Sequence, residues 1–270
     1  MTTHLPTNSN WLFEARTLKS NLIKQSFEAI KDFITEGNLV FSDTGIKLLE
    51  MDTSHVVLAY MQLNAKDFEA YYCVPGKSFD CGIHLMNFNK IMKMISNDDI
   101  ITFYQDADET NELGIIIENS NDHRVKTVKF KLMDLNKSNI KIPPSTFSSI
   151  LNIPSAMFQK ICRDFSVLDE KIEIKSKGNK LIFACNGTIG YVEEEITENS
   201  NSLNIKEQES DEEIIQGVFS IKHLVSFTKC SNLCNTIELY IKNNFPLIIN
   251  YSIGSMGTMM LCLAPKDNDV

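Results

Sequence analysis

The sequence predicts an α+β fold of two similar domains, in which helices cover one face of antiparallel sheets. Apolar residues recur at helical spacing in four segments, and short β-rich runs bounded by polar turn residues lie between those segments. The same order of helices and strands occurs twice along the 270 residues. Because 43% of the chain is hydrophobic, it holds enough apolar material for one large core or for two ordinary domains of about 120 to 130 residues each.

The first half is expected to begin with a helix at residues 21–35, whose apolar face comprises Leu22, Ile23, Phe27, Ile30 and Ile34. A second helix is predicted at residues 87–96. The strands of this half are predicted at residues 39–50, 56–63, 68–72, 100–104, 113–117 and 126–132. The apolar face of each helix can then pack on a sheet.

The second half repeats this order, with helices predicted at residues 155–165 and 221–229. Its strands are predicted at residues 172–175, 181–185, 189–194, 236–241, 247–251 and 258–263. Between the halves lie Pro143 and Pro144, which cannot continue a helix or a central strand. The predicted organisation is therefore a domain at residues 12–131, a connector at 132–148 and a second domain at 149–266.

The composition argues against secretion, a membrane span and a metal centre. The chain has no charged and apolar leader pattern at its start and no run of about 18 apolar residues. Seven cysteines without a Cys-x-x-Cys pair and five scattered histidines give neither a disulfide framework nor a common zinc spacing. We therefore expect reduced thiols packed mostly in the core, no metal and no cofactor.

Cations are concentrated on the predicted helices, although the formal net charge of the chain is -9. Each helix carries two cations three or seven residues apart, so both lie on one helix face. The pairs are Lys24 and Lys31, Lys90 and Lys93, Lys160 and Arg163, and Lys222 and Lys229. An acidic protein with such a surface is suited to contact DNA there without reading bases. The alternative is that these are ordinary solvated residues that pair locally with Glu28, Asp32 or Asp164.

Six short segments carry a resemblance to a known family. They begin at Phe13, Met51, Asn97, Lys131, Ile161 and Leu263, and read FEAR, MDTSHV, NDDIIT, KLMDL, ICRD and LAPK. In this order and at these intervals they closely resemble the proliferating cell nuclear antigen family, the eukaryotic-type DNA sliding clamps. The resemblance extends over about residues 13–266.

The resemblance implies the DNA-clamp fold, with three chains closed head to tail in a ring, helices lining its inner face and antiparallel sheets outside. It implies a processivity factor that encircles double-stranded DNA nonspecifically and catalyses no reaction itself. Such clamps tether DNA polymerase, flap nuclease and ligase in replication and repair, and a separate clamp loader places them on DNA. The expected partners are therefore DNA, two further copies of this chain and these enzymes, but no membrane.

Partners of this family insert a short hydrophobic peptide beside the interdomain connector. The matching positions here are Met51, His55, Val56, Leu58, Ile140, Ile142, Pro143, Pro246, Cys262, Ala264 and Pro265. Core packing is the alternative for Val56 and Leu58, since alternating apolar residues of a strand usually face a core. Cys262 stands where family members usually place an aromatic residue, which implies a pocket without that aromatic wall.

Two predicted strands of opposite charge are candidate subunit edges. Arg124, Lys126 and Lys129 lie on the last strand of the first domain, whereas Tyr191, Val192, Glu193 and Glu194 lie on a strand of the second. Opposite signs on two different edges favour a head-to-tail contact over pairing of identical edges. The acidic segment from Glu193 to Glu213 is expected to form an exposed loop after the edge strand.

Two other functions stay open at this stage, a checkpoint-type clamp subunit of a hetero-oligomeric ring and an acidic α+β enzyme. The sequence has no Gly-rich phosphate loop, Gly-x-Ser-x-Gly elbow or histidine pattern typical of a catalytic centre, which disfavours the enzyme. We expect a nuclear location for a cellular eukaryotic protein and a cytoplasmic replication site for a viral one.

Overall fold

The computed structural model of the chain describes residues 7–119, 121–136, 140, 146–199, 201–209 and 212–266. The chain forms two compact units. The first comprises Met1–Thr53, Ala59–Ile140 and Ile253–Met259, and the second comprises Ser54–Leu58, Lys141–Ser252 and Met260–Val270. Neither unit is a single continuous stretch, because residues 54–58 group with the second unit and residues 253–259 with the first.

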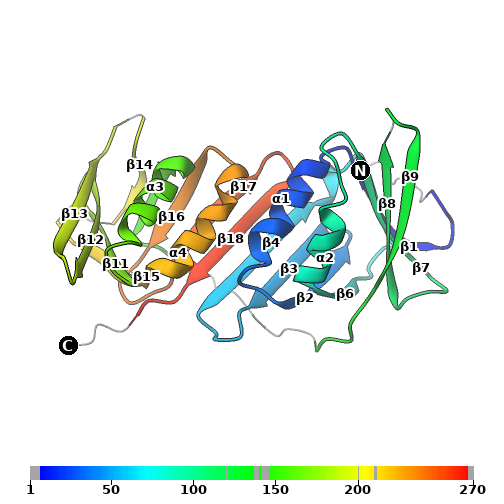
Figure 1. Cartoon of the computed structure of the whole chain (residues 1–270), viewed down its shortest axis with the longest axis horizontal. Coiled ribbons are helices and arrows are strands. Elements are labelled where there is room, and N and C mark those ends of the chain that lie inside the picture. Colours follow the sequence, from blue (N-terminus) through cyan, green and yellow to red (C-terminus); the bar gives the residue numbers. More distant parts are fainter. Residues whose placement is uncertain are drawn as a thin grey trace. The chain divides into compact units, whose positions relative to one another are not determined.

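Two groups of strands and two α-helices build the described part of the first unit. One group has the order β5 (Ala70–Cys73), β1 (Trp11–Thr17), β7 (Ile100–Asp106), β8 (Glu112–Asn119) and β9 (Arg124–Lys131). In the other, the order is β4 (Val57–Asn64), β3 (Gly45–Met51), β2 (Glu36–Ser42) and β6 (Phe79–His84). The 3-10 helix η1 (Ala65–Asp67) follows β4, and α1 (Ser20–Ile30) and α2 (Leu85–Met92) lie side by side (Figure 1).

Aromatic residues join the helices of the first unit to each other and to its strands. Phe27 of α1 meets Phe88 of α2 with 4.7 Å between ring centroids, and Phe88 meets Phe130 of β9 at 5.5 Å. Phe13 of β1 stacks on Phe41 of β2 at 3.9 Å. Full burial of such a side chain stabilises the fold by about 1.5–3 kcal/mol. The apolar faces of α1 and α2 are thus buried, which leaves their polar faces to solvent.

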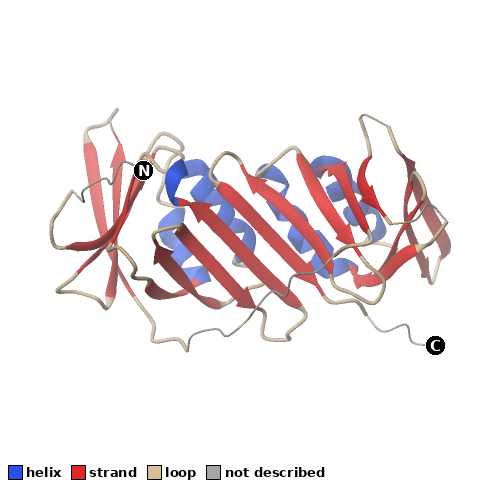
Figure 2. Ribbon diagram, turned by 180° about the vertical axis from the view of Figure 1, so that it is seen from behind, coloured by secondary structure: helices blue, strands red, loops and turns tan. Residues whose placement is uncertain are grey.

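The second unit repeats this plan. One group of its strands has the order β13 (Gly190–Thr197), β12 (Lys180–Gly187), β11 (Lys171–Lys177) and β15 (Ile215–Ser220). The other has the order β14 (Asn204–Gln208), β10 (Ser149–Pro154), β16 (Thr236–Ile241), β17 (Leu247–Ile253) and β18 (Gly257–Leu263). The helix α3 (Ser155–Phe165) packs on α4 (Ile221–Phe227) and on the 3-10 helix η2 (Thr228–Asn232). Figure 2 shows, within each unit, strands in front and helices behind.

The core of the second unit contains aromatic rings, thiols and one buried hydroxyl. Phe158 of α3 meets Phe183 of β12 at 6.2 Å between centroids. Tyr251 of β17 is fully buried, and its hydroxyl donates to the carbonyl oxygen of Phe227 at 3.1 Å. All seven cysteines of the chain are free, and all but the half-buried Cys234 are buried. The prediction that the cysteines pack mostly in the core is confirmed.

The four predicted helices exist, but three of them end earlier than predicted. Only α3 has the predicted bounds. The helix α1 stops at Ile30 instead of residue 35, and α2 stops at Met92 instead of residue 96. Each ends because some of the backbone hydrogen bonds that follow join residues three apart instead of four, such as Phe33 N–H to Ile30 O at 3.2 Å. The fourth helix becomes 3-10 after Phe227. No described helix is long and apolar enough to cross a membrane.

Two strand predictions were wrong. Residues 39–50 form two strands, because the chain turns after Ser42 and re-enters the sheet at Gly45, which adopts a φ of 129°. The acidic segment expected as a loop instead contains the rest of β13 and all of β14, which pairs with β10. The free edge of β10 offers backbone partners that a polar strand can use as well as an apolar one. The strands β1, β6, β10 and β15 were not predicted.

Replacement of Tyr251 by Phe is expected to lower the free energy of unfolding by about 1–2 kcal/mol, because the carbonyl of Phe227 loses a buried donor. Urea denaturation measures this difference. The matched control is Tyr104→Phe, since that ring stacks on Trp11 at 4.3 Å and its hydroxyl has no hydrogen-bond partner among the described residues. An equal loss in both variants would exclude a specific role for the buried hydrogen bond.

Candidate functional site

The helix α2 presents two exposed lysines of the first unit. The ammonium of Lys90 donates to the side-chain oxygen of Asn87 at 2.9 Å. Lys93 lies just after the helix, at the C-cap position, and makes no ion pair or side-chain hydrogen bond with any described residue. Two exposed methionines, Met86 and Met94, lie four residues to either side of Lys90. Both lysines are therefore accessible to an anion.

The two predicted cations of the first helix are held inside the unit. The ammonium of Lys24 donates to the backbone carbonyl oxygen of Ile95 at 3.1 Å. The hydroxyl of Ser20 donates to the backbone carbonyl oxygen of Ser96, also at 3.1 Å. Carbonyls at and after a helix C-terminus lack intrahelical partners, so these donors satisfy the end of α2. Lys31 lies at the C-cap of α1, where it pairs with Asp32 at 2.8 Å and its side chain is only 15% exposed.

The helix α3 presents two exposed cations of the second unit. At its start the hydroxyl of Ser155 donates to the carbonyl oxygen of Cys234 at 2.6 Å, which fixes the position of the helix. Lys160 and Arg163 lie on the exposed face, and Lys160 forms a 3.1 Å ion pair with Asp164. An exposed pair at this spacing is worth at most about 0.5 kcal/mol, so it does not prevent Lys160 from contacting another anion.

The helix α4 and the 3-10 helix that follows it contribute two further exposed cations. Lys222 lies on α4 and Lys229 on η2, so the predicted pair does not share one α-helix. Both residues line a groove of about 640 Å³ together with Lys266. Asp169 and Glu170 line the same groove. The groove is therefore of mixed charge.

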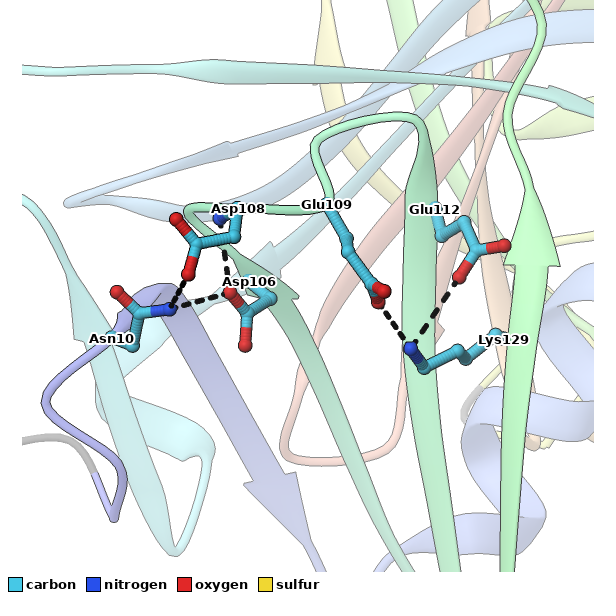
Figure 3. Close-up of polar contacts among 6 residues, drawn as sticks. All are labelled: Asn10, Asp106, Asp108, Glu109, Glu112 and Lys129. Atoms are coloured by element: carbon cyan, nitrogen blue, oxygen red, sulfur yellow. Dashed lines mark hydrogen bonds and ion pairs between the residues drawn. The ribbon is translucent and has the colours of Figure 1, made fainter.

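The predicted interface cation Lys129 is paired within its own chain. It lies on β9, the edge strand of its group, and forms ion pairs with Glu109 and, at 3.9 Å, Glu112 (Figure 3). The hydrogen bond to Glu109 raises the pKa of Lys129. Asn10, which precedes β1, donates from its side-chain amide to the carboxylate of Asp106 at the end of β7, at 2.6 Å (Figure 3). The carboxylates of the β7–β8 turn thus have partners inside the unit.

The other two predicted interface cations of β9 differ in their local pairing. Arg124 forms a 2.6 Å ion pair with Asp122 in the turn before the strand. Lys126 is exposed and makes no ion pair with a described residue. Between them Val125 is 65% exposed on the opposite face of the strand. Of the three predicted interface cations of β9, Lys126 is therefore the one whose charge is available to another chain.

The strand β13 is the edge strand of its group, which confirms that part of the prediction. The hydroxyl of Tyr191 donates to Glu193 on one face of the strand, and this hydrogen bond raises the pKa of the tyrosine. Val192 and Glu194 alternate onto the other face, where Glu194 lies opposite Phe183 of β12. The acidic residues of this edge therefore lie on both of its faces.

Two exposed apolar residues beside this edge were missed by the sequence interpretation. Ile189 at the tip of the β12–β13 hairpin is 77% exposed, and Val167 after α3 is 78% exposed. The hairpin lies against the α3–β11 loop, because a Cβ on Gly187 would fall 2.3 Å from the carbonyl oxygen of Leu168. An isoleucine inside a glycine-flanked turn is a sequence signal that could have indicated an exposed contact residue.

Two predicted residues of the peptide pocket belong to the first unit. Met51 at the end of β3 is 39% exposed. Ile140 is half-buried beside a pocket of about 200 Å³, whose other lining residues are Asn38, Val40, Lys47, Leu49, Glu50 and Asp80. Burial raises the pKa of the Glu50 carboxyl in this pocket. Ile142 and Pro143 lie outside the described residues.

The remaining pocket residues belong to the second unit. Val56 and Leu58 are half-buried and flank the buried Val57, so they are not the core-facing residues of their strand. The backbone N–H of Ala264 donates to the carbonyl oxygen of Val56 at 2.9 Å. The others are the exposed His55 and Pro265, the half-buried Pro246 and the buried Cys262. Burial raises the pKa of the Cys262 thiol to about 12, so this thiol is protonated at neutral pH.

Replacement of Lys24 by Ala is expected to lower the free energy of unfolding by about 1 kcal/mol, because the carbonyl of Ile95 loses its ammonium donor. Lys93→Ala, which removes an exposed cation, should change it by less than about 0.5 kcal/mol. Urea denaturation of both variants measures the difference. Equal stabilities of the two variants would contradict a stabilising hydrogen bond from Lys24 of α1 to the carbonyl of Ile95 after α2.

Comparison with known proteins agrees with this architecture. Residues 12–139 match the family model of the proliferating cell nuclear antigen N-terminal domain, and residues 141–266 match that of the C-terminal domain. The chain is 31% identical over 260 residues to the proliferating cell nuclear antigen of Chaetomium thermophilum, an alignment that covers 96% of this chain and 99% of that relative. With its two α+β domains of mostly antiparallel strands and few helices, the chain belongs to the proliferating cell nuclear antigen family of DNA sliding clamps.

Proposed function

We propose that the protein encircles duplex DNA as a head-to-tail homotrimer and serves as a processivity factor for DNA polymerase. The clamps of this family are not enzymes, and replication and repair are their roles. We propose the same for this chain, without a catalytic residue, metal or cofactor. It would act in the nucleus of a cellular eukaryote or, if viral, at a cytoplasmic replication site.

The observation that carries the proposal is the set of exposed cations on the helices of both units. In a chain of net charge -9 these helices present Lys90, Lys93, Lys160, Arg163, Lys222 and Lys229 to solvent. Lysine and arginine attract phosphates regardless of base sequence, and the attraction weakens as salt rises. A closed ring stays on DNA by topology, so each of these contacts can be weak. Weak contacts allow the ring to slide.

The two edge strands support head-to-tail assembly. The strands β9 and β13 each leave one row of backbone donors and acceptors without a strand partner in the described chain. They differ in charge, so an edge of one copy suits the other edge of the next. Lys126 on β9 and Glu194 on β13 are the charges that we propose to meet, with Val125 and Ile189 as apolar contacts beside them.

The family's peptide pocket is proposed for this chain as well. Short hydrophobic peptides of DNA polymerase, flap nuclease, ligase and the clamp loader would bind through the pocket residues named above. Half-buried apolar side chains such as Val56, Leu58 and Ile140 suit this role, because a peptide plug can bury the surface that they still expose. Cys262 supplies a small thiol at the position of an aromatic wall, which would favour a bulkier plug.

Light scattering across a dilution series tests the assembly. The wild type is expected at about 92 kDa, three times the 30.7 kDa of one chain. Lys126→Glu should weaken the trimer by about tenfold, because it places like charges at the contact, and a second change, Glu194→Lys, should restore it. A mass near 30.7 kDa at every concentration would instead support the subunit of a hetero-oligomeric ring.

The DNA contacts are tested by anisotropy with a linear duplex over a series of salt concentrations. Lys90→Gln and Lys93→Gln should each reduce the slope of log affinity against log salt by roughly 0.9 for every phosphate that the variant no longer neutralises. Lys24→Gln should leave the slope unchanged, because that ammonium is bound to the carbonyl of Ile95. The same slope in all three variants would contradict the proposed contribution of α2.

A further inference from the structure

The first residues of the interdomain connector run along β6 within the first unit. The backbone N–H of Met133 donates to the carbonyl oxygen of Gly82 at 2.9 Å, and the two residues form an antiparallel bridge. Gly82 belongs to β6, whereas Met133 lies two residues after the end of β9. The path of the connector is thus set by backbone pairing where it leaves the five-stranded group.

Gly82 permits this approach because it has no side chain. A Cβ at this position would lie 2.2 Å from the carbonyl oxygen of Met133 and 3.2 Å from Cγ of Leu135. A backbone carbonyl cannot move aside in the way that the end of a flexible side chain can. Any larger residue at position 82 would therefore push the connector away from β6.

A buried asparagine holds the next part of the connector. Asn38 lies directly opposite Gly82 in the β2–β6 ladder and is buried. Its side-chain amide donates to the carbonyl oxygen of Asn136 at 3.3 Å. Further along, Ile140 lines the pocket formed with Val40 and other residues of β2 and β3. Gly82 and Asn38 thus form one docking platform, and Ile140 lines a pocket with residues of both of these strands and of β3.

We propose that Gly82 and Asn38 are positioning residues for partner-peptide binding. This inference rests on the proposed peptide pocket, since Ile140 of the connector would contact the plug. A connector already held in place binds a peptide without the entropic cost of ordering it first. Gly82 and Asn38 would therefore set peptide affinity through the connector.

Titration calorimetry with a synthetic consensus clamp-binding peptide tests this role in the full chain. Gly82→Ala should weaken binding about fivefold to tenfold, as expected for coupling through an intermediate segment. Asn38→Ala, which removes the side-chain donor to Asn136, should weaken it in the same direction and serves if Gly82→Ala does not fold. Hydrogen exchange at the Met133 amide should become faster in Gly82→Ala, because this amide bonds to residue 82.

The matched control is Gly114→Ala in β8. A Cβ there would lie 2.1 Å from the ring of Tyr104, so this variant is also crowded, but in the other group of strands. It should retain wild-type peptide affinity. If the wild type binds the peptide and Gly82→Ala binds it equally well, or if Gly114→Ala loses as much affinity, the positioning role is wrong. If the wild type does not bind the peptide, the proposed pocket itself is wrong.

Discussion

The burial of one face of every helix constrains where this protein can carry positive charge. Phe27 and Phe88 are buried and pack one face of α1 and of α2 into the core of the first unit. Phe158 does the same for α3 in the second unit. Cations on these helices are thereby restricted to the opposite faces. In a chain of net charge -9 the result is a local basic surface on an otherwise acidic molecule. Lys24 is excluded from that surface by its bond to the carbonyl of Ile95.

Much of the fold was predictable because its signals are local. The helix α3 and the strand β16 have the predicted bounds, since apolar periodicity and polar flanks coincide at both ends. The ends of α1 and α2 were missed because no Gly or Pro marks them, and β14 was missed because its sequence NIKEQ has no apolar alternation. It is a strand because β10 offers it a partner, and such pairing is not encoded locally.

The candidate sites, too, were predicted correctly where the signal is local and missed where it depends on distant residues. The spacing of cations correctly indicated exposed residues such as Lys90, Lys160 and Lys222, but it could not show that Lys24 finds a partner 71 residues away. The alternation of residues 56–63 left open whether Val56 or Val57 faces the core, because a one-residue shift reverses the two faces of a strand. The role of Gly82 was equally hidden, since an isolated glycine gives no hint of which segment crosses it.

The internal ion pairs of β9 bear on how a ring of such subunits could open. Arg124 and Lys129 have their partners, Asp122 and Glu109, within their own chain. Separation of two edges would therefore not leave these two charges without a partner. The ion pairs lost on separation would be those of groups such as Lys126, which has no ion-pair partner among the described residues of its own chain. Backbone groups exposed by the break can bond to water. In the ring proposed above, opening would therefore act mainly on the shape and hydration of the edges, and solvent would readily accommodate the separated edge strands.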